Sequence, residues 1–477
     1  QTKKSENSYM TQSIPEKIYF VGAGGIGMAA LERYFLSRGC RVAGYDRTPS
    51  PLTDELAAEG VAIVFDDAPE LIPDDFRDPA STLVVYTPAV PASHRGLTWF
   101  RENGFNVVKR AAILGLVTRD SRALCFAGTH GKTTTSSMAA HLLTQSSAGC
   151  NAFLGGELRN YGTNFLLSRT SPFSVIEADE YDRSFHHLTP EVAVVTSTDP
   201  DHLDIYGTEE AYLESFAHFT ELIREGGALV MHTGLKLKPR VADGVKIYTY
   251  SRDRGDFHAE NIRRGAGTIT FDFVGPDGLC VKDVSLGVPV EVNIENAVAA
   301  MAAVAVTGQL EGESAAKAMA SFKGAKRRFE FLIKTPTMAV IDDYAHHPDE
   351  LRASISSVRA LYPGRRLTVA FQPHLYSRTR DFAPEFAEAL SLADEVILLD
   401  IYPAREEPIP GVTSELIFRS LTCGAKRLIR KEDFVKTIEK LDFETLLTAG
   451  AGDISETLPA MTEALRKRFN LSEDIVK

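Results

Sequence analysis

The sequence has few cysteines, no long apolar segment and no excess of positive charge. Its five cysteines lie far apart and form no C-x-x-C pair, which argues against both a disulfide framework and a zinc site. No apolar run approaches the ~20 residues that a membrane-spanning helix requires. The net charge of −12 makes the chain a poor binder of nucleic acid and of anionic membranes. A cytoplasmic protein without stable membrane contact fits these features best, so any anionic ligand must bind at a local site.

The length of 477 residues suggests several domains, at ~100–200 residues per domain. Residues 1–14 are polar and lack an apolar signal core, so we interpret them as a disordered tail. The rest divides into three blocks, each of which opens with an apolar strand that runs into a glycine-rich or acidic turn. We place the boundaries near residues 121 and 332, which gives domains over 15–121, 122–331 and 332–477.

Strands and helices alternate within the blocks. The strands expected in the first block lie at residues 18–21, 41–45, 61–65, 82–86 and 106–109. Those expected in the third lie at 338–341, 367–370, 396–399 and 446–448, with helices from 349, over 382–392 and at the end of the chain. The second block adds a β-rich segment, 257–281. This alternation predicts an α/β fold whose parallel sheets carry helices on their faces.

The strongest local signal is a phosphate loop at the start of the second block. A strand over 123–127 precedes it, and a helix begins near Lys132. Backbone N–H groups at such a turn, together with the helix N-terminus, form a cradle for phosphate. Lys132 can reach a β- or γ-phosphate, and the Thr133 hydroxyl can bind Mg²⁺. The loop consists of Gly128, Thr129, His130, Gly131, Lys132, Thr133 and Thr134.

This loop departs from the usual G-x-x-x-x-G-K-[ST] spacing, because Phe126 stands where the first glycine is expected. A glycine turn with a solvated lysine is therefore an alternative. Two further strands of the block end in acidic clusters, Glu177–Glu180 and Asp201–Asp204. In an open α/β sheet, ligands bind beyond the carboxyl ends of the strands, and Mg²⁺ prefers oxygen ligands. Either acidic cluster alone could be a solvated loop, but three such strand ends favour a magnesium–nucleotide site.

A second glycine cluster follows the first strand of the chain. It contains Gly22, Gly24, Gly25 and Gly27, and Asp46 stands at the end of the next strand. This pattern predicts a diphosphate at a helix N-terminus and an acidic residue near a ribose, as in Rossmann-like domains. By itself it would indicate a nicotinamide-dependent oxidoreductase. Thr87 and Ala89 lie in another loop at a strand end and could also contact the diphosphate.

Taken in order, the motifs resemble those of the Mur ligases over nearly the whole chain. Besides the two glycine loops and the two acidic clusters, they are the segments NIENA at 293–297, RRFE at 327–330, DDYAHHP at 342–348, FQPH at 371–374, RTR at 378–380 and YPA at 402–404. Each alone is a weak signal, but the ordered set is specific. The resemblance implies a Rossmann-like domain for a UDP-sugar, a central ATP-binding domain and a C-terminal Rossmann-like domain for an amino acid.

The resemblance also implies roles for individual residues. Lys132 would hold the ATP phosphates, and Arg327 or Arg328 would reach the γ-phosphate. Mg²⁺ (or Mn²⁺) would be bound by Thr133, Glu177 and His202. Asn296 would contact the adenine with Asn293 nearby, and Asp343 would hold the ribose. The first glycine loop, with Asp46, Thr87 and Ala89, would bind the UDP-sugar. The residues expected around the reacting carboxylate and the amino acid are His346, His374, Arg378 and Arg380. The two arginines are one residue apart and would face opposite ways on a strand, so their spacing predicts a loop if both contact a ligand.

The implied activity is ATP-dependent amide formation between the carboxylate of UDP-N-acetylmuramate and L-alanine, through an acyl phosphate. Either His346 or His374 could accept the proton of the amine. Several family members carry a carbamylated lysine after the histidine that corresponds to His202, but residues 203–223 contain no lysine. This absence favours the alanine-adding branch. The compact run 181–187, which continues into a strand without an insertion, favours it too.

Three alternatives remain at this stage. A sister ligase attaches a recycled murein peptide to the same UDP-sugar and would differ only in its amine pocket. A nicotinamide oxidoreductase would account for the first glycine cluster but not for Lys132, Glu177 or His202. A nucleotide-binding regulator without catalysis would not need the intact lysine, metal ligands and arginines. The sequence leaves open whether the chain forms a homodimer.

Overall fold

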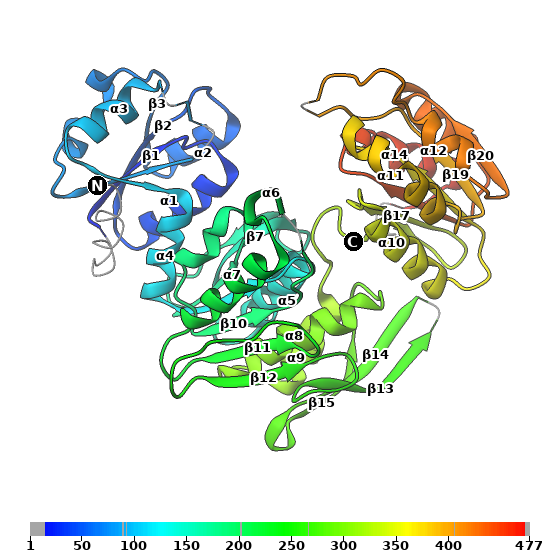
Figure 1. Cartoon of the computed structure of the whole chain (residues 1–477), viewed down its shortest axis with the longest axis horizontal. Helices are drawn as coiled ribbons and strands as arrows, with labels where there is room; N and C mark the ends of the chain where they lie inside the picture. The colour runs from blue at the N-terminus through cyan, green and yellow to red at the C-terminus, as the bar shows by residue number, and fades with distance from the viewer. Residues whose placement is uncertain are drawn as a thin grey trace.

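The computed structural model describes residues 15–87, 90–91, 93–200, 203–265, 267–404 and 406–472. Within these ranges the chain folds into three α/β parts, each built on its own main sheet. In Figure 1 the first part is blue and the third is yellow to red, and both lie above the green second part. The predicted α/β fold class is confirmed.

The first part is a five-stranded parallel sheet in the order β3-β2-β1-β4-β5. Its strands are β1 (Lys17–Val21), β2 (Arg41–Tyr45), β3 (Ala62–Val64), β4 (Thr82–Tyr86) and β5 (Asn106–Lys109). Its helices are α1 (Ile26–Ser37), α2 (Pro51–Ala58), α3 (Arg95–Glu102) and α4 (Arg110–Asp120). The strand order reverses at β1, so the glycine loop that follows β1 lies at the point where such sheets bind ligands.

The second part contains a seven-stranded sheet in the order β12-β11-β10-β6-β9-β7-β8. Its strands are β6 (Arg122–Ala127), β7 (Asn151–Leu158), β8 (Thr163–Leu166), β9 (Phe173–Glu177), β10 (Val192–Val195), β11 (Ala228–His232) and β12 (Lys246–Tyr250). The helices are α5 (Lys132–Gln145), α6 (Leu203–Tyr206), α7 (Glu209–Glu221), α8 (Val292–Val306) and α9 (Gly312–Ser321), with a 3₁₀ helix η4 (Tyr181–His187). The central strand β6 pairs in parallel with β9 and β10, so all three carboxyl ends meet at one edge.

An antiparallel three-stranded sheet extends from the second part. It consists of β13 (His258–Gly265), β14 (Thr268–Val274) and β15 (Cys280–Ser285), in the segment for which the sequence predicts β structure. Phe271 and Phe273 of β14 are fully buried and belong to the core that also contains α8 and α9. The sheet is therefore packed on the second part rather than separate from it.

The third part is a six-stranded sheet in the order β16-β17-β21-β18-β19-β20. Its strands are β16 (Glu330–Lys334), β17 (Ala339–Asp343), β18 (Leu367–Phe371), β19 (Glu395–Leu398), β20 (Ala425–Leu428) and β21 (Thr445–Ala449). Its helices are α10 (Pro348–Leu361), α11 (Tyr376–Leu390), α12 (Glu415–Ser420), α13 (Phe434–Lys440) and α14 (Leu458–Phe469). Only β16 is antiparallel, and it begins before residue 332, so the domain boundary drawn there falls inside a strand.

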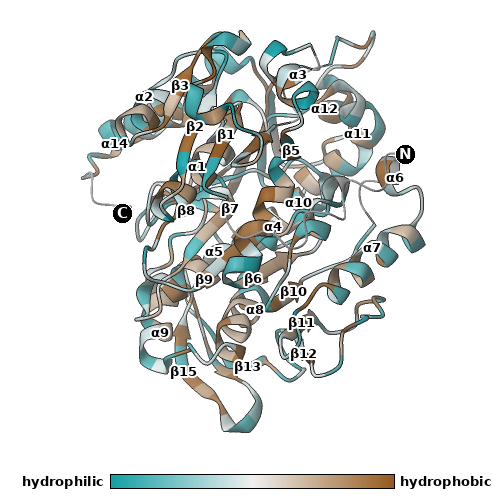
Figure 2. Ribbon diagram, turned by 90° about the vertical axis from the view of Figure 1, so that its left-hand side faces the viewer, coloured by the Kyte–Doolittle hydropathy of each residue, from teal (hydrophilic) through white to brown (hydrophobic). Residues whose placement is uncertain are grey.

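Most of the parallel strands are apolar along their whole length because helices cover both faces of each sheet. Figure 2 shows this as brown strands enclosed by helices with teal outer faces. The first and second parts share a core, in which the rings of Tyr34 and Phe153 lie 5.6 Å apart. Between the second and third parts, Arg159 forms an ion pair with Glu330 at 3.1 Å. No described helix is long and apolar enough to cross a membrane.

Candidate nucleotide and ligase site

The phosphate loop connects the carboxyl end of β6 to the N-terminus of α5. Gly128 and Gly131 have backbone φ angles of +139° and +83°, which residues other than glycine rarely adopt. A Cβ atom on Gly128 would also lie 2.1 Å from Thr196 Oγ1. Glycine at these positions therefore lets the loop turn tightly against the end of β10, with the N-terminus of a fourteen-residue helix facing the site.

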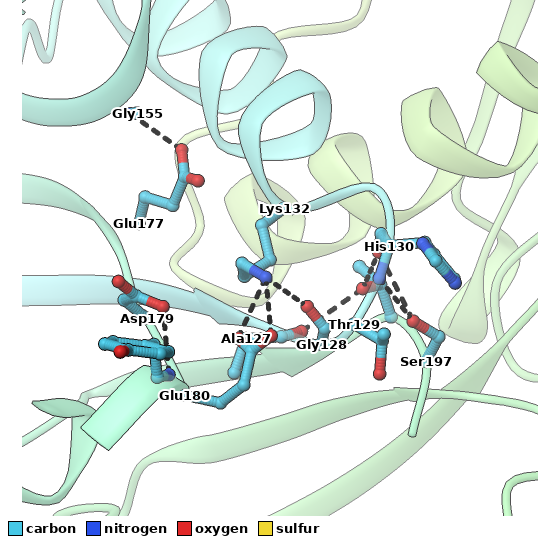
Figure 3. Close-up of polar contacts among 12 residues, drawn as sticks. Ala127, Gly128, Thr129, His130, Lys132, Gly155, Glu177, Asp179, Glu180 and Ser197 are labelled. Carbon is cyan, nitrogen blue, oxygen red and sulfur yellow. Dashed lines mark hydrogen bonds and ion pairs between the residues drawn. The ribbon is translucent and has the colours of Figure 1, made fainter. Parts of the chain in front are cut away.

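The loop is tied to the segment that follows β10. Ser197 accepts the His130 backbone N–H on its hydroxyl at 2.8 Å and the Thr129 N–H on its carbonyl at 3.3 Å. The Thr129 hydroxyl donates to the Asp199 carbonyl at 2.7 Å and contacts the Tyr212 hydroxyl at 2.9 Å. Figure 3 shows the contacts of Ser197 with the loop. The ends of β6 and β10, two of the three strand ends that the sequence predicts to lie together, are thus in direct contact.

Lys132, the first residue of α5, lies at the base of the loop. Its ammonium donates to the Gly128 carbonyl at 2.6 Å and forms an ion pair with Glu180 at 2.8 Å (Figure 3). The Glu180 side chain is only 2% exposed, and burial raises the pKa of its carboxyl group despite the nearby ammonium. The expected phosphate-binding lysine therefore has a buried carboxylate as its counter-ion.

Thr133 and Glu177 form the part of the predicted metal site that lies within the described residues. The Thr133 hydroxyl donates to Glu177 Oε1 at 2.9 Å, and the Gly155 backbone N–H donates to Glu177 Oε2 at 2.7 Å. A hydroxyl and a carboxylate suit Mg²⁺, which usually takes one or two protein ligands and completes its octahedron with water and phosphate. His202, the third predicted ligand, lies outside the described residues. Among the described residues, no group of three or more His, Cys, Asp or Glu is arranged to hold a metal ion.

Asn293 and Asn296 lie on the first turns of α8, where they are buried against the phosphate loop. Asn296 donates to Asn293 Oδ1 at 2.9 Å and accepts from the Thr135 hydroxyl at 3.2 Å. Its Oδ1 atom lies 3.0 Å from where a Cβ on Gly131 would be. In this arrangement Asn296 supports the loop, and its contact with adenine stays a prediction.

Arg327 and Arg328 occupy different environments although they are adjacent. Arg327 Nε donates to Asp342 Oδ2 at 3.1 Å, and its side chain is 15% exposed. Arg328 is exposed and lies over the Tyr344 ring, with 5.5 Å between its guanidinium carbon and the ring centroid. Because Arg327 is already paired with a buried carboxylate, Arg328 is the better candidate of the two for a phosphate.

The predicted third-domain residues gather at the carboxyl ends of β17 and β18. The rings of His346 and His374 lie 6.1 Å apart. His346 Nδ1 lies 3.0 Å from the Tyr344 carbonyl and 3.2 Å from Glu350 Oε2, and burial lowers the pKa of His346. Asp343, whose pKa burial raises, accepts the Ser354 hydroxyl and the Ala345 N–H. Both histidines therefore lie at one edge of the sheet, and either remains a candidate to accept the proton of the amine.

Arg378 and Arg380 lie in α11, so the prediction that they lie on a loop is wrong. The helix α11 begins at Tyr376 and has non-helical φ/ψ angles at Phe382, shortly before Pro384. Pro384 lacks the backbone N–H that would bond to the carbonyl of Arg380. Residues two apart on a helix point in different directions. Arg380 pairs with its exposed neighbour Asp381, whereas the positive charge of Arg378 lies close enough to lower the pKa of His346. Only Arg378 is thus placed beside the histidines.

In the first part, the glycine loop is closed by Asp46 and Thr87. The Gly24 N–H donates to Asp46 Oδ2 at 2.7 Å, and a Cβ on Gly22 would lie 2.6 Å from Thr87 Cγ2. Gly25 is the N-cap of α1 and has no side-chain cap, which leaves the N-terminus of the helix open to an anion. The contact of Asp46 with a ribose stays a prediction, and Ala89 lies outside the described residues.

The sequence analysis missed Arg110, which also lies at this loop. Its Nη1 atom is 2.3 Å from where a Cβ on Gly27 would be, so the guanidinium lies directly against the glycine. Arg110 is exposed and begins α4 at the carboxyl end of β5. Among the described residues no carboxylate pairs with it. A guanidinium beside an open helix N-terminus is a site for a diphosphate. The sequence signal, a basic residue after a strand end, is too common to single it out.

Family comparisons match three successive segments of the chain. Residues 17–122 match the model described as the Mur ligase family, catalytic domain, and residues 126–304 match the Mur ligase middle domain. Residues 327–455 match the Mur ligase, glutamate ligase domain. These segments correspond to the three parts of the fold.

Individual relatives agree with this assignment. The UDP-N-acetylmuramate–L-alanine ligase of Phocaeicola vulgatus is 59% identical over 454 residues, which cover 95% of this chain and 99% of that protein. The protein of the same name from Parabacteroides distasonis is 60% identical over 95% of this chain and 98% of its own length. The crystal structure of the Thermotoga maritima UDP-N-acetylmuramate–alanine ligase is 27% identical and has a TM-score of 0.73, covering 94% of this chain and 99% of that one. These similarities extend over all three parts, and the chain belongs to the Mur ligase family.

Proposed function

We propose that this chain is the ATP-dependent ligase that joins L-alanine to the carboxylate of UDP-N-acetylmuramate, with release of ADP and phosphate. As a Mur ligase, it forms a carbon–nitrogen bond in peptidoglycan synthesis. The observation that carries the proposal is the meeting of three strand ends in the second part. The ends of β6 and β9 bring Lys132, Thr133 and Glu177 together, and Ser197 after β10 is bonded to the same loop, which supports a shared phosphate site. The chemistry and the unpaired cysteines fit a cytoplasmic protein.

The first chemical step joins two anions, and this chain supplies the groups that neutralise their charge. An oxygen of the muramic acid carboxylate attacks the γ-phosphorus of ATP, the bond to the β,γ-bridging oxygen breaks, and ADP leaves with that bond's electrons. Lys132 and Arg328 would stabilise the negative charge of the transferring phosphoryl group. Bound Mg²⁺ would supply charge neutralisation at the phosphates, with Thr133 and Glu177 among its ligands.

The second step consumes the acyl phosphate. The amine of the amino acid attacks the carbonyl carbon, the bond to the phosphate oxygen breaks, and phosphate leaves with one oxygen of the original carboxylate. The amine must lose a proton, and either His346 or His374, whose ring centroids lie 6.1 Å apart, would accept it. Arg378 would bind the carboxylate of the amino acid through its fork of N–H donors. Because these residues belong to the third part and Lys132 to the second, chemistry requires the parts to close.

The first glycine loop would hold the diphosphate of the UDP-sugar. The open N-terminus of α1 and the guanidinium of Arg110 both provide positive potential there. Gly22, Gly24, Gly25 and Gly27 allow the diphosphate to approach the backbone, and Thr87 packs against them. This arrangement suits the proposed UDP-sugar without requiring a nicotinamide cofactor.

L-alanine is favoured over a recycled peptide by the relatives and by the sequence. The relatives at 59% and 60% identity both carry the name of the L-alanine ligase. A murein peptide ligase from Psychrobacter arcticus is 22% identical with a TM-score of 0.59, which is a similarity of fold alone. The absence of lysine from residues 203–223 and the compact η4 segment also favour alanine.

The test is phosphate release with ATP, Mg²⁺ and UDP-N-acetylmuramate, with and without an amine. We expect release that depends on L-alanine, with an alanyl product identified by mass. Release only with the murein tripeptide would assign the chain to the recycling activity instead. No release with either amine would contradict a ligase function.

A further inference from the structure

The contacts of Lys132 differ from those that ATP binding requires of it. An ammonium has three N–H donors. In this structure its nitrogen lies 2.6 Å from the Gly128 carbonyl, 2.9 Å from Glu180 Oε1 and 2.8 Å from Glu180 Oε2. The ammonium donates hydrogen bonds to the first two of these oxygens, and Glu180 Oε2 adds its negative charge at ion-pair distance. A phosphate that takes Lys132 as its counter-ion must therefore compete with the Glu180 carboxylate.

We infer that Glu180 is a positioning residue that holds Lys132 away from the nucleotide phosphates, so that ATP must displace this carboxylate in order to bind. The inference rests on the proposed function, in which Lys132 binds the phosphates of ATP. The inferred role of Glu180 is indirect, because the carboxylate acts on ATP binding through its ion pair with the lysine. It sets the affinity for ATP by stabilising the nucleotide-free loop.

Glu180 is fixed where it can compete for the lysine. Its side chain is 2% exposed, and its backbone carbonyl accepts the hydroxyl of Tyr206. The Tyr206 ring is in turn covered by the guanidinium of Arg183, whose carbon lies 4.8 Å from the ring centroid. An ion pair in such a water-poor site is stronger than one at the surface. The burial that raises the pKa of Glu180 also makes the carboxylate costly to leave without its cation.

The neighbouring acid, Asp179, provides a matched control. Asp179 lies next to Glu180 in sequence, but its carboxylate accepts the Tyr181 N–H at 3.0 Å (Figure 3). Among the described residues no basic side chain pairs with Asp179. Replacing either acid by its amide removes one negative charge from the same loop. Only the replacement of Glu180 frees the ammonium of Lys132.

The test is isothermal titration of the full-length protein with a non-hydrolysable ATP analogue and Mg²⁺. We expect Glu180→Gln to bind the analogue about tenfold more tightly than wild type, because one charge-assisted hydrogen bond no longer competes. Asp179→Asn should stay within about twofold of wild type, since a surface charge contributes little. The Kd for UDP-N-acetylmuramate should be unchanged in both variants. A merely structural role for Glu180 would weaken or preserve ATP binding, and either result overturns the inference.

Two further variants keep the result unambiguous. Glu180→Asp retains the charge but shortens the side chain by one methylene, and tighter binding of the analogue by this variant also supports the inference if Glu180→Gln does not fold. Lys132→Ala should lose affinity for the analogue. If Lys132→Ala binds as well as wild type, the proposed role of the phosphate loop fails. If Lys132→Ala loses binding but the Glu180 variants match wild type, only the positioning role fails.

Discussion

Arg327 and Asp342 form an ion pair at the start of the third part, with Arg327 Nε 3.1 Å from Asp342 Oδ2. The Asp342 side chain is fully buried and also accepts the Thr448 hydroxyl at 2.6 Å. Arg327 also donates to the carbonyl of Gly450, so it links β17 to the segment after β21. Because of this pairing, Arg327 stabilises the third part, and its neighbour Arg328 is available to a ligand.

Replacement of Arg328 should therefore lower activity, whereas replacement of Arg327 should lower stability. Arg328→Ala should lower kcat by ~10²–10³ because a cation is lost from the transferring phosphoryl group. Its unfolding temperature should match that of wild type. Arg327→Ala should lower the free energy of unfolding by ~3 kcal/mol, because Asp342 would be left as an unpaired buried carboxylate. Kinetics and thermal unfolding of both variants check this, and the reverse pattern would contradict the assignment of Arg328.

Arg110→Ala should weaken binding of the UDP-sugar. Loss of a guanidinium from a diphosphate site should raise KM for UDP-N-acetylmuramate by ~10–100-fold, as expected for a charge-assisted hydrogen bond of ~1.5–3 kcal/mol. The KM for ATP should not change. Arg41→Ala is the matched control, because Arg41 begins β2 at the opposite end of the same sheet. Equal KM values for wild type and Arg110→Ala would show that the diphosphate binds elsewhere.

Glu32 should make stability depend on pH. It lies on α1 with its side chain fully buried, and neither carboxyl oxygen has a hydrogen-bond partner among the described residues. Burial raises the pKa of Glu32 well above its usual value. The folded chain therefore binds a proton that the unfolded chain, with a glutamate pKa of ~4.3, releases. The contribution of Glu32 to the free energy of unfolding should therefore be greatest below pH ~4.3 and be lost as the pH rises through the raised pKa of the folded chain.

Glu32→Gln tests this directly, because glutamine has nearly the same shape but cannot ionise. We expect its first unfolding transition to lie above that of wild type at pH 8 by a few degrees, as for a gain of ~1 kcal/mol. The difference should shrink at pH 5. Glu102→Gln, an exposed change at the end of α3, should have no such effect. A difference that grows toward low pH would contradict the raised pKa.

Much of the fold could be predicted because buried parallel strands are continuous apolar runs that end in glycine or acidic turns. The strands β1, β6 and β18 were located in this way. The strand β7, which lies between β9 and the edge strand β8, was not, because it contains Gly155 and Gly156 and an exposed Glu157, which interrupt the apolar pattern. The start of α11 was placed too late, because Phe382 and Pro384 interrupt the helix that already begins at Tyr376.

The candidate site divides in the same way. Lys132, Thr133 and Glu177 could be predicted because each stands just after a strand whose position the sequence reveals. Arg110 and the Lys132–Glu180 pair could not, since both depend on contacts between segments that only the tertiary structure brings together. Similarly, the choice between Arg327 and Arg328 depends on which of the two side chains pairs with Asp342. Two adjacent arginines in a sequence do not show which of them forms this contact.

The most direct test of ligation through an activated carboxylate uses UDP-N-acetylmuramate labelled with ¹⁸O in its lactyl carboxylate. The purified protein would be incubated with this substrate, ATP, Mg²⁺ and L-alanine, and the phosphate and amide products would be analysed by mass spectrometry. We predict one labelled oxygen in each phosphate released and the other in the new amide carbonyl, in equal amounts. An amide formed together with unlabelled phosphate, or phosphate released without an alanyl product, would contradict the account.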